Sequence, residues 1–152
     1  MRLVESWELD ADSFITDNNS KSKLKTVFQI WEKGENRKPD WKNIEKLFDV
    51  KVVQNTAGRK CNWELRNTSD ILIPQAFYDS ENGKTRRYWD DSLYGTAYAV
   101  SAKNRSMVDD MVAWLESADW YGQYSSAATH GCRHVNKFFI YQRLSEKFSG
   151  ED

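Results

Sequence analysis

The sequence is poor in the residues that bend, loosen or cross-link a chain. It holds two prolines, seven glycines and two cysteines in 152 residues, and it has no long Pro, Gly or Ser tract. Such a composition argues against extended disorder and favours one domain over residues 1–148, with a disordered tail at residues 149–152. Cys61 and Cys132 lie far apart in a chain without an export signal, so both are predicted to be reduced thiols.

Long apolar runs are also missing. The most apolar windows are short and broken by polar residues, far below the roughly 20 residues that a membrane-spanning helix requires. The chain opens with Met-Arg-Leu-Val-Glu-Ser-Trp-Glu, which has acidic residues where a signal peptide needs an apolar stretch. The sequence therefore predicts a cytoplasmic protein that makes no membrane contact.

Charge of one sign is not in excess. The 22 basic residues are matched by 23 acidic ones, which gives a net charge of −1. A nearly neutral chain has no global attraction for nucleic acid, so any such binding has to come from local clusters. Aromatic residues, by contrast, are abundant, with seven Trp. Some of these rings are expected in a groove or an interface, where they supply a large contact area.

The pattern of apolar residues predicts an α+β fold. Strands are expected at residues 2–9, 26–31, 49–53, 61–66, 70–78 and 93–102, and helices at residues 40–48, 106–117 and 134–147. Asp40 and Ser106 are the expected caps of the first two helices. Because strands and long helices do not alternate, we expect a mixed or antiparallel sheet of about five to seven strands with two to three helices, the last two in the C-terminal third.

The most specific string of the sequence occupies residues 24–33. It reads Leu-Lys-Thr-Val-Phe-Gln-Ile-Trp-Glu-Lys and follows Leu-Asp-Ala-Asp-Ser-Phe at residues 9–14. This pair of segments resembles the strand pair near the end of the catalytic fold in a group of N6-adenine DNA methyltransferases, where a Phe-Gln-Ile-Trp motif leads into a target-recognition region. The later order is similar too, with a strand near residues 94–100, a helix, and a last helix at residues 134–144. The resemblance covers most of this chain but only the C-terminal segment of such an enzyme.

The motifs that would make the chain an active methyltransferase are missing. Members of that family carry a Gly-rich turn for S-adenosylmethionine and an Asn/Asp-Pro-Pro-Tyr/Phe motif that holds the flipped adenine. Here Pro39 and Pro74 are far apart, and the glycines form no nucleotide-binding turn. No catalytic residue is carried over, and the chain alone is expected to bind no cofactor. S-adenosylmethionine would enter only through a partner subunit, and the assembly would then be an adenine-specific DNA methyltransferase.

His130, Cys132 and His134 are the other residues with possible chemistry. Alternating His and Cys in a short loop supply one face of a zinc site, but a site needs three or four ligands and a supporting second shell. A Cys–His nucleophile pair is the other alternative, although adjacency in sequence is not the geometry that such pairs use. We therefore predict no metal site.

Local clusters of basic and aromatic residues favour contact with nucleic acid. The segment 84–89 combines cations with an aromatic side chain in a long charged loop, and the segment 130–137 leads into a helix N-terminus, where backbone N–H groups favour phosphate. Similar groups occur at residues 59–60 with Arg66 and at residues 37–38 beside Trp41, and each cluster also fits an ordinary solvated face. The predicted nucleic-acid-binding residues are Lys84, Arg86, Arg87, Trp89, His130, Arg133 and Lys137.

Three functions of different classes follow from these observations. The first is a non-catalytic DNA-recognition or accessory module related to an adenine DNA methyltransferase, as one half of a split enzyme whose catalytic subunit is a separate chain. The second is a small interaction protein, anti-restriction or regulatory, that binds a nucleic-acid enzyme. The third, ranked lowest, is a small enzyme of unrecognised type. Self-association is also compatible with the sequence, because a fragment of a larger sheet leaves unpaired edges.

Overall fold

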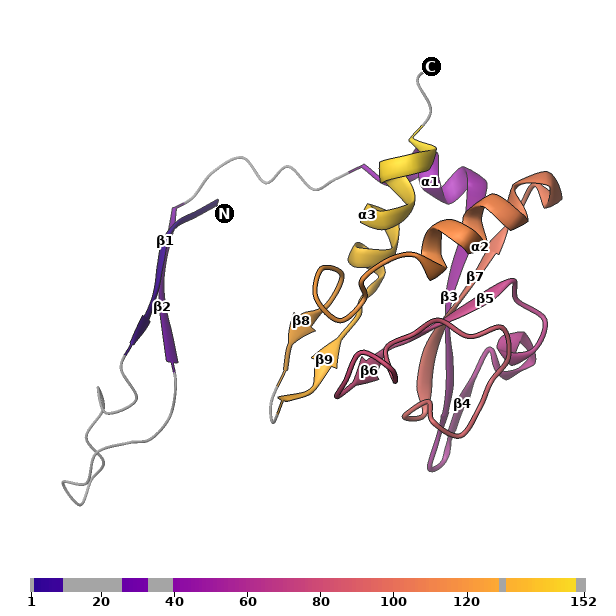
Figure 1. The fold of residues 1–152 in the computed structure, drawn as a ribbon, viewed down its shortest axis with the longest axis horizontal. Helices are drawn as coiled ribbons and strands as arrows, with labels where there is room; N and C mark the ends of the chain where they lie inside the picture. The colour runs from indigo at the N-terminus through magenta and orange to yellow at the C-terminus, as the bar shows by residue number, and fades with distance from the viewer. Residues whose placement is uncertain (1, 10–25, 33–39, 129–130, 150–152) are drawn as a thin grey trace. The chain divides into compact units, whose positions relative to one another are not determined.

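The computed structural model describes residues 2–9, 26–32, 40–128 and 131–149 of the chain (Figure 1). These residues fall into two compact units, residues 1–39 and residues 40–152, which are described separately below. The prediction of a single domain over residues 1–148 stays a prediction. Of the predicted tail, Ser149 ends the last helix and donates its backbone N–H to Ser145, and the other three residues lie outside the described part.

The first unit contains an antiparallel pair of strands. β1 (Arg2–Leu9) pairs with β2 (Thr26–Glu32), with Arg2 opposite Glu32 and Leu9 opposite Thr26. The register shifts between Leu3 and Glu5, as at a β-bulge. Both strands are as predicted, and the Phe-Gln-Ile-Trp motif lies on β2. The segment 9–14 that precedes the motif continues from β1 into residues outside the described part.

The second unit is built on a four-stranded antiparallel sheet in the order β4-β3-β7-β5. Its strands are β3 (Phe48–Thr56), β4 (Arg59–Cys61), β5 (Ile71–Pro74) and β7 (Thr96–Ala102). Buried and exposed residues alternate at the start of β3, whereas β7 is buried along nearly its whole length. A strand buried on both faces needs cover on each side, and the structure provides two different covers.

Three helices cover one face of this sheet (Figure 1). They are α1 (Lys42–Leu47), α2 (Val108–Glu116) and α3 (Lys137–Phe148). α2 and α3 bury an apolar stripe at helical spacing against Val50, Tyr98 and Val100 of the sheet, which forms the larger core. The buried helical residues are Ile44, Met111, Val112, Leu115, Ile140 and Leu144.

A smaller core lies on the opposite face of the sheet. Val53, Leu72, Leu93, Ala97 and Ala99 form it. Its cover is Trp63 and Leu65 from a 3₁₀ turn, η1 (Trp63–Arg66), and Trp89 from the long loop, with the two indole rings edge to face at 4.9 Å.

The strand predicted at residues 61–66 is therefore wrong over most of its length. Asn62 adopts a left-handed backbone conformation with φ of 46°, which ends β4 and starts the 3₁₀ turn. Its side chain donates a hydrogen bond to the carbonyl of Val52 at 2.8 Å. Asn tolerates this conformation better than most residues, because its short polar side chain can bond locally.

The strand predicted at residues 70–78 is divided between two sheets. β5 ends at Pro74, and β6 (Ala76–Phe77) joins a three-stranded antiparallel sheet, β6-β9-β8, with β8 (Ser126–Ala127) and β9 (Arg133–His134). Gln75 lies at the change: its N–H bonds the carbonyl of Thr96 in one sheet, and its carbonyl accepts the N–H of Val135 beside the other.

The described residues thus form nine strands in three antiparallel sheets and three helices, of which α2 and α3 lie in the C-terminal third. The predicted α+β class is confirmed, although the strands are more numerous and belong to separate sheets. α2 ends at Ser117 as predicted, but its expected cap is wrong. The N-cap of α2 is Met107, which makes no side-chain capping bond, and Asn104 instead caps the 3₁₀ turn η2 (Arg105–Met107) that precedes the helix. At the start of α1 the N-cap is Trp41, again without a side-chain capping bond, although Asp40 accepts the N–H of Lys42.

None of the helices in the described part of the chain has the length and apolar character that a bilayer crossing requires. Both cysteines are free thiols, with Cys61 exposed and Cys132 buried.

Candidate nucleic-acid interface

The long loop between β6 and β7 is organised around Arg86. Its backbone forms an isolated antiparallel bridge with Leu72, with N···O distances of 2.7 and 2.9 Å. The guanidinium, only 14 % exposed, bonds the Asp90 carboxylate and the Ser92 hydroxyl at 2.8 Å each, and the carbonyl of Lys84 at 2.6 Å. Arg86 is one of the predicted nucleic-acid-binding residues, and the structure places it inside the loop as its main anchor.

Asp90 completes this anchor. One carboxylate oxygen accepts from Arg86, and the other accepts the backbone N–H of Ser92 at 2.8 Å and the Ser92 hydroxyl. Burial by itself raises the pKa of the Asp90 carboxyl, but the hydrogen bonds from Ser92 and the positive charge of Arg86 outweigh it, so the pKa is held below its ordinary value. The loop is thus pinned by an ionised carboxylate at neutral pH.

Lys84 and Arg87 lie on either side of Arg86 in sequence and point to solvent. Their side chains are 66 % and 52 % exposed. Lys84 pairs with Glu81 at 2.6 Å, and Arg87 pairs with Glu116 at the end of α2 at 3.2 Å. Ion pairs at such exposure contribute about 0–1 kcal/mol, because solvent screens them and ordering long side chains costs entropy. Both cations are therefore presented at the surface in weak, exchangeable pairs.

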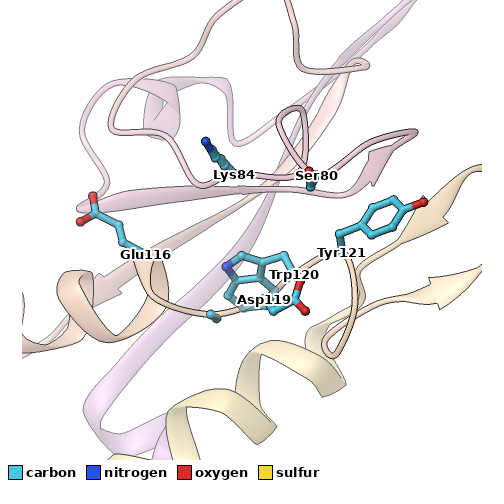
Figure 2. A pocket seen from close by; sticks show the side chains of 8 residues that line it. Ser80, Lys84, Glu116, Asp119, Trp120 and Tyr121 are labelled. Carbon is cyan, nitrogen blue, oxygen red and sulfur yellow. The ribbon is translucent and has the colours of Figure 1, made fainter.

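A pocket lies between this loop and the loop that follows α2 (Figure 2). Its volume is about 200 Å³. Figure 2 shows Ser80 and Lys84 on one side, with Asp119, Trp120 and Tyr121 on the other. Lys84 is itself a lining residue, and Arg87 is connected to the pocket through its ion pair with the lining residue Glu116. Gly83 and Ala118 complete the set of lining residues.

Arg133, from the C-terminal part of the chain, lies over a lining residue of this pocket. Its guanidinium bonds the hydroxyl and the carbonyl of Ser125 at 3.1 and 2.7 Å and lies 5.8 Å from the ring of Tyr121. Tyr121 lines the pocket and tilts against Phe77 of β6 at 6.3 Å. Since β6 pairs with β9, Phe77 lies opposite Arg133, and the ring of Tyr121 lies against both side chains. Sequence spacing alone did not predict this contact.

The other predicted residues are not placed at this pocket. Trp89 packs against Trp63 in the smaller core, and its backbone N–H bonds the carbonyl of Arg66 at 3.1 Å. Lys137 is exposed at the first position of α3, but the side chain of Asn136 accepts the N–H of Phe139 and so caps part of that helix end. His130 lies outside the described residues.

Several exposed aromatic residues have no place in the sequence-based site. Tyr78 and Tyr94 lie edge to face with ring centroids 5.7 Å apart, and each is more than half exposed. Tyr121 is also exposed and belongs to the pocket. The sequence did not mark them as exposed, because Tyr78 and Tyr94 fall inside the strands predicted at residues 70–78 and 93–102. In the structure Tyr78 follows β6, Tyr94 precedes β7, and Tyr121 lies in the loop after α2. Periodicity assigns core residues and is silent about residues at strand ends and in loops.

Metal binding has little support in the described part of the chain. There, no group of three or more His, Cys, Asp or Glu side chains is arranged to hold a metal ion. Cys132 is buried and His134 is exposed on β9, while His130 lies outside the described ranges.

Comparison of the chain with protein-family models, with curated proteins and with solved structures finds no match. The resemblance to the C-terminal segment of an N6-adenine DNA methyltransferase accordingly stays a prediction.

Proposed function

We propose that the chain is a non-catalytic nucleic-acid-recognition module and that DNA is bound at the pocket between the 79–92 loop and the loop after α2. The observation that carries this proposal is that Lys84 lines the pocket together with the exposed Tyr121, while Arg87 pairs with the lining residue Glu116 and Arg133 lies over the Tyr121 ring. Cations next to an exposed aromatic ring are the usual means of holding a phosphate backbone beside a base.

The weakness of the two surface ion pairs supports this use. Glu81 and Glu116 hold Lys84 and Arg87 in the free protein, and a phosphate can replace each carboxylate at small cost. The anchor formed by Arg86 and Asp90 fixes the loop, so the two cations are positioned before binding and less side-chain entropy is lost. Glu116 and Asp119 also line the pocket, so we expect phosphate to bind next to the cations and away from these two carboxylates.

The Phe-Gln-Ile-Trp string of β2 supports a more specific version of the proposal. In that version the module is an accessory part of an adenine-specific DNA methyltransferase, in the cytoplasm, and a separate catalytic subunit supplies the chemistry and binds S-adenosylmethionine. Mixing the chain with such a subunit would then be required for methylation. The version is abandoned if the chain changes neither the activity nor the DNA affinity of any candidate catalytic subunit.

The direct test is the binding of a labelled DNA duplex to the purified chain, measured by fluorescence anisotropy across a salt series. The double variant Lys84→Ala with Arg87→Ala removes two exposed cations. Each phosphate contact contributes roughly 0.9 to the slope of log K against log salt, so the slope should become less steep by about two and affinity at low salt should fall at least about ten-fold.

The matched control is the double variant Lys42→Ala with Lys46→Ala, which removes the same charge from the exposed side of α1. Duplex affinity and salt slope should stay within about two-fold of the unchanged chain. Equal losses in both double variants would mean that binding follows net charge rather than this site. No duplex binding at low salt would reject the proposal and favour the interaction protein that binds a nucleic-acid enzyme.

A further inference from the structure

The hairpin of β3 and β4 ends in a basic tip. Residues 55–60 form this tip, with Asn55 opposite Lys60 and Thr56 opposite Arg59 across the turn. Gly58 has a left-handed φ of 77°, which closes the turn. Among the described residues neither Arg59 nor Lys60 forms an ion pair, and both are exposed, so their charge is available to a ligand.

An open hollow of about 600 Å³ lies at this tip. Its lining is Asn55, Thr56, Ala57, Gly58, Arg59 and Lys60. The lining contains amide, hydroxyl and cationic groups and no carboxylate, which is the opposite of the mixed lining of the first pocket. A surface of this composition is complementary to a phosphate-bearing chain.

Gly95 brings an aromatic residue to the same tip. The N–H of Asn55 bonds the carbonyl of Gly95 at 2.8 Å, and a Cβ at Gly95 would approach Thr56 Cγ2 to 2.8 Å. With its φ of 75°, this position favours glycine on both counts. Tyr94 is therefore held next to the hairpin tip by the close approach of two backbones.

Tyr94 forms an aromatic pair with Tyr78. Its ring meets the ring of Tyr78, which follows β6, at a centroid distance of 5.7 Å and an interplanar angle of 84°. The two side chains are 54 % and 53 % exposed. Large aromatic side chains left this exposed as a contacting pair are apolar area that a ligand can still cover, and Gly95, next to Tyr94, bonds Asn55 of the hairpin that carries Arg59 and Lys60.

We propose that Tyr78 and Tyr94 form a stacking platform for unpaired bases of a single DNA strand whose phosphates run along Arg59 and Lys60. This inference rests on the proposed function and deepens it, because it gives the module a second contact that reads an unpaired strand rather than a duplex. Each base has a π-face that stacks on a tyrosine ring irrespective of sequence. In a duplex those faces are covered by neighbouring bases, so only an unpaired strand can use the platform.

The test compares a labelled oligothymidylate of about ten nucleotides with the labelled duplex, in the same buffer and at several salt concentrations. In the variant Tyr78→Ala with Tyr94→Ala the affinity for oligothymidylate should fall roughly 5- to 100-fold, since stacking one base contributes about 1–3 kcal/mol. Its salt slope should be unchanged, because no phosphate contact is lost. Duplex affinity should also be unchanged.

Three further variants separate stacking from charge and from general surface effects. Tyr78→Phe with Tyr94→Phe keeps both rings and should keep oligothymidylate binding. Arg59→Ala with Lys60→Ala should weaken the binding and lower its salt slope by roughly 0.7 for each lost phosphate contact. Tyr88→Ala, which removes an exposed tyrosine outside the pair, should leave it unchanged.

The outcomes distinguish this inference from the proposed function. If the unchanged chain binds the duplex and the alanine pair keeps full affinity for oligothymidylate, the stacking platform is rejected and the proposed function survives. The platform is also rejected if the phenylalanine pair loses as much affinity as the alanine pair. If the chain binds neither probe at low salt, the proposed function itself has failed. Circular dichroism and the thermal midpoint of each variant show whether a loss reflects unfolding.

Discussion

Lys84, Arg86 and Arg87 are neighbours in sequence but have different roles in the structure. The residue types alone do not show this difference. Lys84 and Arg87 are exposed in weak ion pairs, whereas Arg86 is almost fully enclosed by oxygen acceptors of its own loop. The guanidinium has five N–H donors in a fixed fork, so it satisfies several carbonyl and carboxylate oxygens at once. The sequence shows a basic cluster but not which of its members is bonded within the loop, because the acceptors come from turns that only the folded loop creates.

The loop anchor predicts a pH dependence of stability. The pKa of Asp90 is lowered in the folded chain, so its stabilising contribution is present above its ordinary pKa of 3.8 and is lost as pH falls through the folded value. Asp90→Asn should lower the free energy of unfolding at pH 6 by no more than about 1 kcal/mol, since the group is half-exposed and screened. The difference between the two chains should shrink as pH falls below about 4, as measured by urea unfolding between pH 3 and pH 7.

The matched control for this change is Asp91→Asn. Asp91 is the next residue in the same loop, and among the described residues it forms no side-chain hydrogen bond or ion pair. Its replacement should leave both the stability and its pH dependence close to those of the unchanged chain. A stability difference for Asp90→Asn that persists undiminished at pH 3 would show that charge is not what pins the loop.

At the scale of elements, the sequence predicted those helices and strands whose positions follow from the periodicity of apolar residues. Strands at β1, β2, β3 and β7 and the apolar stripe of α2 follow from alternation and from helical spacing, and they are present. The misplaced boundaries are those decided by the tertiary hydrogen bonds of single residues. Asn62 ends β4 through a bond to a strand carbonyl ten residues earlier, and Gln75 shares its two backbone groups between two sheets. Such partners are chosen by tertiary contact, which local propensity does not encode.

α2 and α3 are joined by a polar contact as well as by their apolar stripes. Arg143 of α3, only 11 % exposed, donates to the carbonyl of Trp114 at 3.0 Å and to the Ser117 hydroxyl at 2.9 Å, and its guanidinium lies 3.4 Å from the centroid of the Trp114 ring. In return the indole N–H donates to the Arg143 carbonyl at 2.6 Å. The carbonyls of the last helical turn lack partners within the helix, and the Trp114 carbonyl accepts from both the Arg143 guanidinium and the Ser117 hydroxyl, the latter at 3.0 Å.

Arg143→Lys tests this contact. A lysine keeps the charge but loses the planar fork, so it does not bond the Trp114 carbonyl and the Ser117 hydroxyl together while lying over the Trp114 ring, although the Ser117 hydroxyl still donates to that carbonyl. We expect the free energy of unfolding to fall by about 0.5–1.5 kcal/mol, the contribution of a typical hydrogen bond, in urea unfolding followed by circular dichroism. Arg59→Lys makes the same chemical change at an exposed position without an ion pair and should cost less than about 0.5 kcal/mol. Equal effects of the two changes would mean that Arg143 contributes only charge.

At the scale of the whole molecule, the candidate sites lie where segments distant in sequence meet. The first pocket is formed by residues 80–84 and 116–121 with Arg133 beside it, and the stacking pair joins residues 78 and 94 to the hairpin at residues 55–60. The sequence shows which segments are rich in cations. Which of these segments lie close together depends on the pairing of the strands. The pairing of β6 with β9 and of β3 with β7 brings together the segments of the two candidate sites. Strand partners cannot be deduced from composition.

The location of the cores predicts which part of the chain is sufficient for folding. Every residue of both cores, from Trp41 to Phe148, belongs to residues 40–149. A chain of these residues should unfold in one cooperative urea transition, with near-ultraviolet circular dichroism and tryptophan fluorescence reporting the same midpoint. A chain of residues 40–136 lacks α3 and with it the buried Ile140 and Leu144, each of which contributes about 2–5 kcal/mol when removed from a core. That loss is comparable to the whole stability of a small domain, so the shorter chain should show no cooperative transition. A gradual, non-cooperative transition in the 40–149 chain would mean that these cores need further residues to form.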